Sequence, residues 1–517
     1  MYAKGMVQST RETERKYAAP AADDTSWLPD LTGVDGIASV VDRGTDDLDA
    51  VYYDTVDLRL TGTSATLRRR TGGADAGWHL KLPLSGDSRE EVRAPLSDTV
   101  PDDLRDLVIS RTRDAELVPV VRLRTERHRH ELVDADGNAL AELSVDAVEA
   151  ASLLAGATRA SWTELEVELA EDAGPEVLKA VDKALRKAGV ERESAPSKLA
   201  RALEETAAGA PRLPDPRAET VVEGSAGDLV LRYLEQQVRT LVDLDPAVRR
   251  NRPDSVHRMR VACRRLRSVL RSYRSVLDRE ATDPVREELT WLAGELGAER
   301  DHEVLEKRLS SAVEALPREL VLGPVTARLR AWHVTKDAEA RTRAQDALAS
   351  PRYLSLLDSL AGLTARPPLR RKAARKPKAV LAKTVLEEYD RFAGRVRTAL
   401  QTSPGADRDT ALHQAGKAAR KARYATEPAR ASLGRPAKRL GKRVKAVQKV
   451  LEDHQDSVVS RDELRRMAVA AGAAGEAGFT WGLLYGREQA VAGERQRELP
   501  GVWARASDPA LRRALKV

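Results

Sequence analysis

The sequence predicts an α+β protein, with an antiparallel β-sheet closed or nearly closed on itself in its first part and helices alone in its second. Two observations lead to this fold class. Up to about residue 205, short runs of alternating apolar and polar residues recur between turn-rich pieces, which is the pattern of half-buried strands. Beyond residue 222 the chain is rich in Ala, Leu and Arg with an almost continuous helical period. Many strands with few helices favour a curled antiparallel sheet, and an unbroken helical period favours bundles.

Seven runs in the first part have the alternation expected of strands. They are 12–17, 51–55, 65–70, 78–82, 120–124, 140–148 and 162–169. Turn-rich pieces such as 71–73 and 134–138 separate them. Helical patterns are confined to 101–109 and 175–188, and Gly189 closes the second.

Composition divides the chain into domains. Residues 207–222 contain three prolines among small residues, which is typical of a linker. We therefore expect a first domain at 1–206 and a helical domain at 223–515.

The helical domain contains a repeat. His257 and His413 are each followed at +7, +8 and +10 by a basic residue. A basic, proline-containing joint at 366–378 separates the two copies. The duplication predicts two related four-helix bundles, at about 223–365 and 378–515.

Composition and charge exclude several classes of protein. One cysteine, Cys263, excludes a disulfide framework and fits a reducing, cytoplasmic setting. No run approaches the roughly 18 apolar residues of a membrane span, and the N-terminus has no apolar signal core. Residues 1–205 hold 27 Lys and Arg against 40 Asp and Glu, whereas 206–517 hold 60 against 40. The second part is therefore suited to a polyanion.

The charged faces of the predicted strands carry both signs. Because residues i and i+2 share a face, Glu12, Glu14 and Lys16 lie together, as do Arg68 and Arg70. The same spacing groups His79 with Lys81, Glu142 with Asp146, and Glu164 with Glu166 and Glu168. Clustered carboxylates repel one another unless solvent or a metal ion screens their negative charge. Carboxylate oxygens are also the ligands that Mg²⁺ or Mn²⁺ prefers. Arginine holds phosphate by bidentate bonds. The residues leave two interpretations open: a solvated face, or a site for metal-assisted phosphoryl transfer to water.

Glu12-x-Glu14-x-Lys16 resembles the ExExK signature of the CYTH, or triphosphate tunnel metalloenzyme, family. The resemblance extends over roughly residues 8–205. The positions that match the rest of the family pattern are Arg68, Arg70, Lys81, Glu91, Arg127, Asp146, Glu166, Glu168 and Lys198. It implies an eight-stranded antiparallel β-tunnel with flanking helices that takes in a triphosphate tail.

The CYTH resemblance also implies roles for these residues. It assigns triphosphate binding to Arg68, Arg70, Lys81, Arg127 and Lys198. It assigns the binding of Mg²⁺ or Mn²⁺ to Glu12, Glu14, Glu91, Asp146, Glu166 and Glu168, and Glu164 is an alternative ligand for the same ion. Lys16, Glu12 and Glu14 are the expected catalytic residues, Lys16 by binding phosphate or ordering the site.

The helical part carries basic rows without acidic residues. From His257 to Arg274 no Asp or Glu occurs, and the cations step by three or four residues along one helical face. An acid-free run also follows His413 up to Glu427. A solvated face normally mixes both signs, because like charges stacked along a helix cost a few tenths of a kcal/mol per pair. Several such rows favour a bound anion over a solvated face.

The spacing of the basic rows resembles the CHAD family over about residues 223–515, with Leu296-Gly297-x-x-Arg300-Asp301 as a second signature. The resemblance implies binding of inorganic polyphosphate. The expected polyphosphate-binding residues are His257, Arg260, Arg264, Arg265, Arg267, Arg271, His413, Lys417, Arg420, Lys421, Arg423, Lys442, Lys445 and Lys449. Gly416 departs from the pattern, because the first repeat has an arginine there.

Together these features predict a metal-dependent hydrolase of inorganic triphosphate or polyphosphate ends, held on polyphosphate by its helical domain. An alternative is a non-catalytic protein that docks on polyphosphate granules in the cytoplasm. Nucleic acid is disfavoured, because aromatic residues are only 4% of the chain and base stacking needs them. Thiamine triphosphatase and adenylate cyclase chemistry remain open, as do the metal and the oligomeric state. No membrane or protein partner is inferred.

Overall fold

The computed structural model describes residues 8–19, 27–84, 86–154, 158–206 and 221–516, with the side chains of 298–301 left out. The chain forms two compact units, Met1–Pro214 and Asp215–Val517. The division falls within the expected linker at 207–222, most of which lies outside the described residues.

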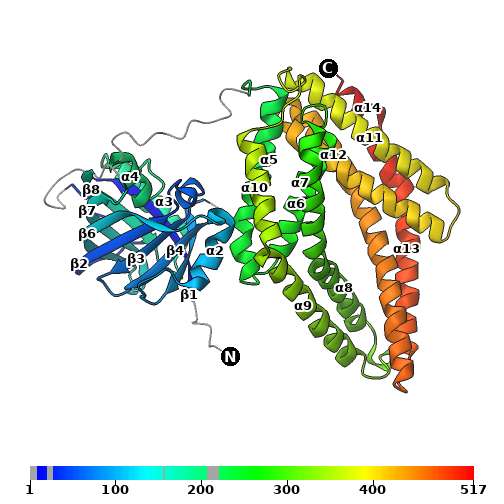
Figure 1. The fold of residues 1–517 in the computed structure, drawn as a ribbon. Helices are drawn as coiled ribbons and strands as arrows, with labels where there is room; N and C mark the ends of the chain where they lie inside the picture. The colour runs from blue at the N-terminus through cyan, green and yellow to red at the C-terminus, as the bar shows by residue number, and fades with distance from the viewer. Residues whose placement is uncertain (1–7, 20–26, 85, 155–157, 207–220, 517) are drawn as a thin grey trace. The chain divides into compact units, whose positions relative to one another are not determined.

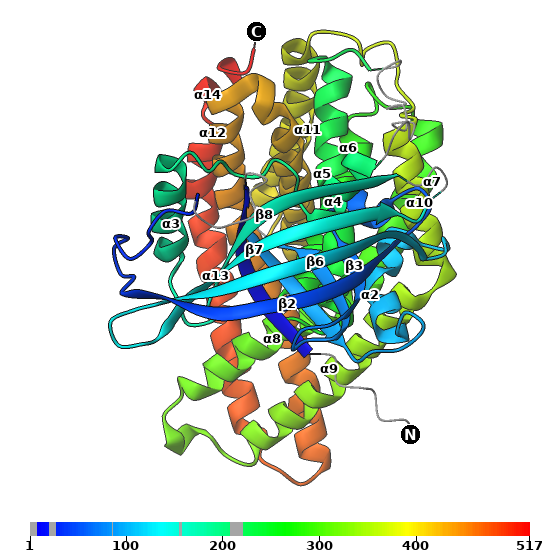
Figure 2. The same ribbon diagram turned by 90° about the vertical axis from the view of Figure 1, so that its left-hand side faces the viewer.

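The first unit is a closed antiparallel barrel of eight strands in the order β1-β5-β4-β3-β2-β6-β7-β8 (Figures 1 and 2). The strands are β1 (Gln8–Ala18), β2 (Ser39–Asp54), β3 (Thr66–Thr71), β4 (Gly77–Pro83), β5 (Ser88–Ala94), β6 (Val118–Val133), β7 (Ala139–Ser152) and β8 (Arg159–Leu169). The predicted α+β class and tunnel are confirmed. The sequence pattern missed β5, because charged residues occupy both of its faces.

Helices cover the outside of the barrel with apolar side chains. They are α1 (Arg59–Gly62), α2 (Asp102–Thr112), α3 (Pro175–Lys187) and α4 (Lys198–Thr206). Helix α3 begins with Pro175 at its first turn, and Gly189 follows its end with φ +85°. Its Leu178, Val181 and Leu185 pack on apolar residues of β7 and β8. Each buried side chain of this kind contributes about 2 kcal/mol, so this packing turns the opposite, charged strand faces into the barrel.

The second unit is helical and shows the expected duplication. Its elements are α5 (Ala226–Arg249), α6 (Ser255–Ser272), α7 (Arg279–Glu295), α8 (Gly297–Glu314), η1 (Arg318–Leu320), α9 (Val325–Ala349), α10 (Pro351–Ala365), α11 (Pro377–Gln401), α12 (Ala406–Ala473), α13 (Phe479–Ala506) and α14 (Pro509–Arg513). Gly434 has non-helical backbone angles and divides α12 in two. In chain order, α5, α6, α7–α8 and α9–α10 precede the joint at 366–378, and α11, the two parts of α12 and α13–α14 follow it.

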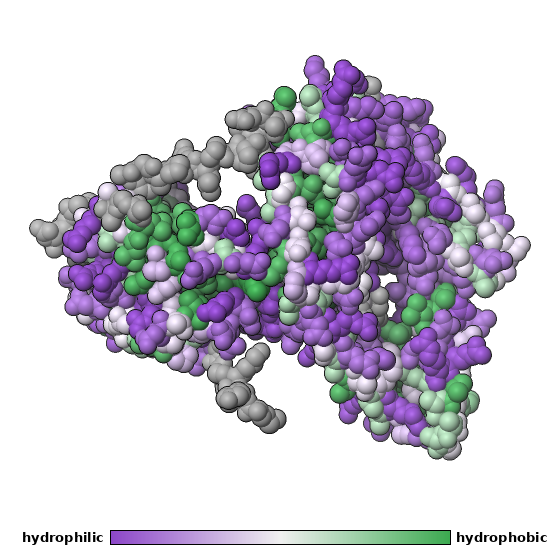
Figure 3. All heavy atoms as spheres, in the orientation of Figure 1, coloured by the Kyte–Doolittle hydropathy of each residue, from purple (hydrophilic) through white to green (hydrophobic). Residues whose placement is uncertain are grey.

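The two repeats share one hydrophobic core rather than forming separate bundles. Apolar side chains of α5, α6 and α7 pack with those of α11, α12 and α13. Buried Tyr273 donates a 2.7 Å hydrogen bond from α6's end to the carbonyl of Ala425 in α12. The visible face of this unit is mainly hydrophilic (Figure 3). Among the described residues, no helix is both long and apolar enough to cross a membrane.

Candidate functional site

Strand register gathers the predicted acidic and basic residues inside the barrel. Glu14 of β1 lies opposite Glu168 of β8, and Lys16 lies opposite Glu166. A cavity of about 460 Å³ fills the lumen. The predicted residues that line it are Glu12, Glu14, Lys16, Arg68, Arg70, Lys81, Glu91, Arg127, Glu166, Glu168 and Lys198. The strand pattern therefore converges on one site.

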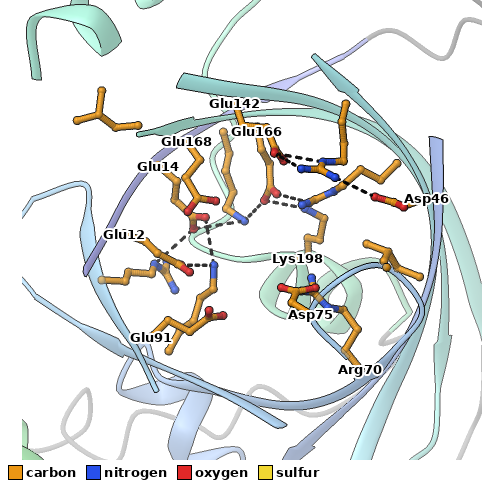
Figure 4. Close-up of a pocket in the computed structure, with 18 of the residues that line it drawn as sticks. Glu12, Glu14, Asp46, Arg70, Asp75, Glu91, Glu142, Glu166, Glu168 and Lys198 are labelled. Carbon is orange, nitrogen blue, oxygen red and sulfur yellow. Dashed lines mark hydrogen bonds and ion pairs between the residues drawn. The ribbon is translucent and has the colours of Figure 1, made fainter. Parts of the chain in front are cut away.

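Carboxylates form one wall of the lumen. Glu12, Glu14, Glu91 and Glu168 lie on one side in Figure 4. Lys81 Nζ lies 2.6 Å from Glu12 Oε2 and 3.4 Å from Glu14 Oε2. Burial favours the protonated form of Glu14, but Lys16 and Lys81 outweigh it and lower its pKa to about 2. Glu14 therefore keeps its negative charge, whereas burial raises the pKa of Glu12.

Glu168 differs from the other three carboxylates of this wall in its surroundings. Among the described residues it has no cationic group within 4.0 Å and no hydrogen-bond donor. Burial raises the pKa of its carboxyl to about 7, with the neighbouring charges of Glu12 and Glu14 adding to the effect. A half-buried carboxylate without a partner is disfavoured in its charged form, so this position is suited to an added cation.

Arginines form the facing wall. Arg68 Nη1 donates to the Tyr52 hydroxyl at 3.3 Å, and its Nη2 lies 4.0 Å from Glu91. The buried Nε atoms of Arg68 and Arg70 have no acceptor in the described parts of the chain. Burial, followed by repulsion from Arg68, lowers the pKa of Arg70 to about 10. Two buried guanidinium groups with spare donors are suited to an oxyanion.

Lys198, which also lines the cavity, is surrounded by three carboxylates. Its Nζ lies 2.8 Å from Asp146, 2.7 Å from Glu164 and 2.6 Å from Glu166. These three carboxylates lie close enough together for a metal ion, but the ammonium group with its three donors already fills their centre. Asp146 and Glu164 do not line the cavity. Asp146, predicted for metal, lies in this acidic cluster and also contacts Arg127.

Arg127 joins this buried network. Its guanidinium reaches both oxygens of Asp146, at 2.8 and 2.7 Å, and Glu166 at 2.6 Å. Desolvation opposes the charged form, but Asp146 and Glu166 outweigh it and raise the pKa of Arg127. The group is held in a fixed orientation at the edge of the lumen.

Sequence reasoning missed Asp75, Tyr52 and Arg93, and it placed His79 on the face of Lys81 without giving it a role. Asp75 comes from the turn between β3 and β4, forms an ion pair with Arg70 and lies 3.9 Å from Arg93. Its backbone carbonyl lies 2.9 Å from His79 Nε2, whose Nδ1 is 3.0 Å from Glu91. Figure 4 shows Asp75 and Arg70 together at the lumen. A turn residue has no periodicity to reveal it, whereas Arg93 stands two positions from Glu91 and follows once β5 is recognised as a strand.

A second cavity, of about 860 Å³, lies among α6, α7, α8 and α12. The predicted residues that line it are His257, Arg260, Arg264, Arg267, Arg271, His413, Lys417, Arg420 and Lys421. Arg267, Arg271, Lys417 and Lys421 have no carboxylate within 4.0 Å in the described parts of the chain. Burial and the charge of Arg271 lower the pKa of Lys421. The second cavity therefore gathers positive charges that nearby carboxylates only partly neutralise.

Five predicted polyphosphate-binding residues lie elsewhere. Arg265 and Arg423 flank Tyr424 and contact Glu427 at 3.1 and 3.6 Å, which links the repeats. Lys442, Lys445 and Lys449 are exposed on α12 and do not line the cavity. They share one helical face, but sequence spacing does not tell which face borders the other repeat.

The second signature supports the cavity through close packing. A Cβ on Gly297 would lie 3.2 Å from an Nη atom of Arg260, so glycine leaves room for that guanidinium. The side chains of Arg300 and Asp301 lie outside the described residues. A Cβ on Gly416, the departure in the second repeat, would lie 3.5 Å from the Leu451 side chain, and Lys417 beside it lines the cavity.

Comparisons with known proteins agree with both units. The CYTH domain matches residues 10–203 and the CHAD domain matches residues 232–465. Two uncharacterized proteins of Mycobacterium tuberculosis, from strains CDC 1551 and H37Rv, are each 38% identical, covering 97% of this chain and 97% of their own length.

Two solved structures resemble part of the chain. PptA from Streptomyces chartreusis is 22% identical with a TM-score of 0.47 and covers 54% of this chain and 99% of its own. The CHAD domain from the plant Ricinus communis is 22% identical with a TM-score of 0.46. The match covers 56% of this chain and 94% of that domain's chain. From the domain matches and the full-length relatives, the chain belongs to the family of proteins in which a CYTH domain is followed by a CHAD domain.

Proposed function

We propose that the barrel is a metal-dependent hydrolase of inorganic triphosphate or of polyphosphate ends, and that the helical unit binds inorganic polyphosphate. The CYTH domain indicates a tunnel metalloenzyme of the triphosphatase or cyclase kind. The observation that carries the proposal is the pair of facing walls, carboxylates on one side and arginines with spare donors on the other. Both are needed to hold a metal-bound chain of phosphates.

The residues present fit a divalent cation. Glu12, Glu14 and Glu168 would hold it, since Glu168 is half-buried without a cationic partner among the described residues and carboxylate oxygens are the ligands that Mg²⁺ and Mn²⁺ prefer. When bound, the ion neutralises phosphate charge and lowers the pKa of a coordinated water.

The chain's own residues position the substrate. Arg68 and Arg70 donate hydrogen bonds to phosphate oxygens, which places the chain along their wall and stabilises charge that builds up on the phosphoryl group. Lys81 sits between the carboxylates and the lumen and limits their repulsion of the incoming anion. Lys16 and Lys198 hold Glu166 in place, so the lumen keeps its shape.

Phosphate release tests the proposed reaction. The full chain is given triphosphate, ATP, thiamine triphosphate or long-chain polyphosphate with Mg²⁺ or Mn²⁺. We expect turnover of triphosphate, lowered by at least about 100-fold in Glu12→Ala and in Glu14→Ala. Glu149→Ala, on an exposed face of β7, is the matched control. Normal turnover in both lumen variants would contradict the metal assignment, and triphosphate binding without release would favour the non-catalytic alternative.

Retention on immobilised polyphosphate tests the helical unit. Arg264→Ala combined with Arg420→Ala removes a cation from each wall of the second cavity. We expect weaker retention with triphosphate turnover mostly intact, because the barrel is a separate compact unit. Equal retention by this variant and the unmodified chain would refute the role proposed for the cavity.

A further inference from the structure

The joint between the two helical repeats is an exposed cluster of positive charge. Residues 366–378, here called the basic joint, contain seven Lys and Arg and no Asp or Glu. All seven side chains are exposed: Arg366, Arg370, Arg371, Lys372, Arg375, Lys376 and Lys378. Within the described residues, none of them has a carboxylate within 4.0 Å. Like charges this close repel, so an anion at the joint would be stabilised.

The basic joint is held firmly in place. Ala373 is buried in the core of the unit, and its carbonyl accepts a 2.8 Å hydrogen bond from Gly227 N. The carbonyl of Arg375 accepts from Ala226 N at 3.0 Å. On its other side the joint pairs with the α6–α7 connection, through Arg370 N to Val276 O and Asp278 N to Pro368 O, both at 2.8 Å. All four bonds use the backbone and leave the charged side chains of the joint exposed.

The basic joint continues the row of cations on α6. Arg267 and Arg271 line the second cavity, and Arg274 follows at the end of this helix with its side chain exposed. Arg370 Nη1 lies 3.5 Å from the carbonyl of Arg274. Figure 1 shows the joint between α10 and α11 at the end of the unit where α6 finishes and α5 begins. A linear polyanion leaving the cavity along α6 therefore meets the joint next.

We infer that the basic joint is a second polyphosphate-binding site, which makes the helical unit bind long chains more tightly than short ones; this rests on the proposed polyphosphate role of the cavity. A short chain occupies the cavity alone. A long chain reaches past Arg274 and contacts the joint as well, which adds phosphate contacts without a second entropy cost of association. The joint contains no aromatic residue on which a base would stack, so it fits polyphosphate better than single-stranded nucleic acid.

Binding at several salt concentrations tests the inference on the full chain. The variant carries Arg371→Gln, Lys372→Gln and Arg375→Gln, which leave the backbone bonds of the joint unchanged. The probes are inorganic tripolyphosphate and long-chain polyphosphate. We expect the long chain to bind about tenfold more weakly, with the slope of log affinity against log salt reduced in size by about 2 for three lost contacts. Tripolyphosphate binding stays unchanged.

Two further variants separate the possible outcomes. Arg318→Gln, Arg330→Gln and Arg465→Gln remove the same charge from exposed positions outside the joint and the cavity, and should bind both probes normally. The cavity variant at Arg264 and Arg420 should lose long-chain polyphosphate, whereas tripolyphosphate still binds in the barrel. If the unmodified chain binds neither probe, the proposed polyphosphate role fails and the inference with it. If it binds both, but the joint variant keeps the same long-chain affinity and salt slope, the inference alone is refuted. Single-stranded DNA that binds as tightly as polyphosphate and shows the same loss would overturn the assigned ligand.

Discussion

The half-buried Glu168 carboxyl gives a stability test that needs no substrate. Burial raises its pKa from 4.5 to about 7. Between these two pH values the unfolded chain has lost this proton while the folded barrel keeps it, so this group makes stability fall as pH rises. The difference corresponds to about 3 kcal/mol, which is fully developed above pH 7 and absent below pH 4.5. Glu168→Gln keeps the shape of the side chain and removes this loss.

Calorimetry of the metal-free protein measures the effect. For a unit of this size, about 3 kcal/mol shifts the melting temperature by roughly 6–12 °C. We expect Glu168→Gln to melt higher than the unmodified chain by about that amount at pH 8 and to match it at pH 4. Glu149→Gln, exposed on β7, is the control and should change neither value. A difference between Glu168→Gln and the unmodified chain that is the same at both pH values would refute the half-buried, unpartnered state of this carboxyl.

Three other changes test the surroundings of the two cavities. Lys198→Met leaves the carboxylates of Asp146, Glu164 and Glu166 without their shared ammonium group, so denaturant unfolding should show a loss of about 3–5 kcal/mol at pH 7; an unchanged midpoint would contradict the network. Asp75→Asn removes the carboxylate that pairs with Arg70, so the guanidinium of Arg70 becomes available to phosphate. The KM for triphosphate should fall several-fold with kcat little changed. A higher KM would show that Asp75 only supports the turn. Gly297→Ala places a methyl group 3.2 Å from the Arg260 guanidinium and should weaken retention on polyphosphate. Gly362→Ala, on α10 outside the cavity and with open space around it, should not.

Most of the site residues in the barrel could be predicted from the two-residue periodicity of the strands. The alternation of Glu12, Glu14 and Lys16 places them on one face, and the structure brings that face into the lumen because the other face packs on helices. The pattern does not distinguish Glu164 from Glu166 and Glu168. Only the closed barrel shows that Glu166 and Glu168 line the cavity, whereas Glu164 does not line it and contacts Lys198.

Features that depend on contacts between distant segments were beyond prediction. Asp75 reaches Arg70 from a turn, and turns have no repeating pattern that tells where a side chain points. The rows at Arg264 and at Lys442 look alike in sequence, but packing of α12 against α6 encloses the first and leaves the second exposed. Repeated basic residues therefore predict an anion-binding surface, and the tertiary fold determines which of them face a common cavity.

A structure of the full chain soaked with tripolyphosphate and Mn²⁺ tests the central claim most directly. We expect phosphate oxygens within hydrogen-bond distance of Arg68 and Arg70, and anomalous density for Mn²⁺ at Glu12, Glu14 and Glu168. Tripolyphosphate bound only outside the barrel, with no Mn²⁺ at these carboxylates, would contradict the account.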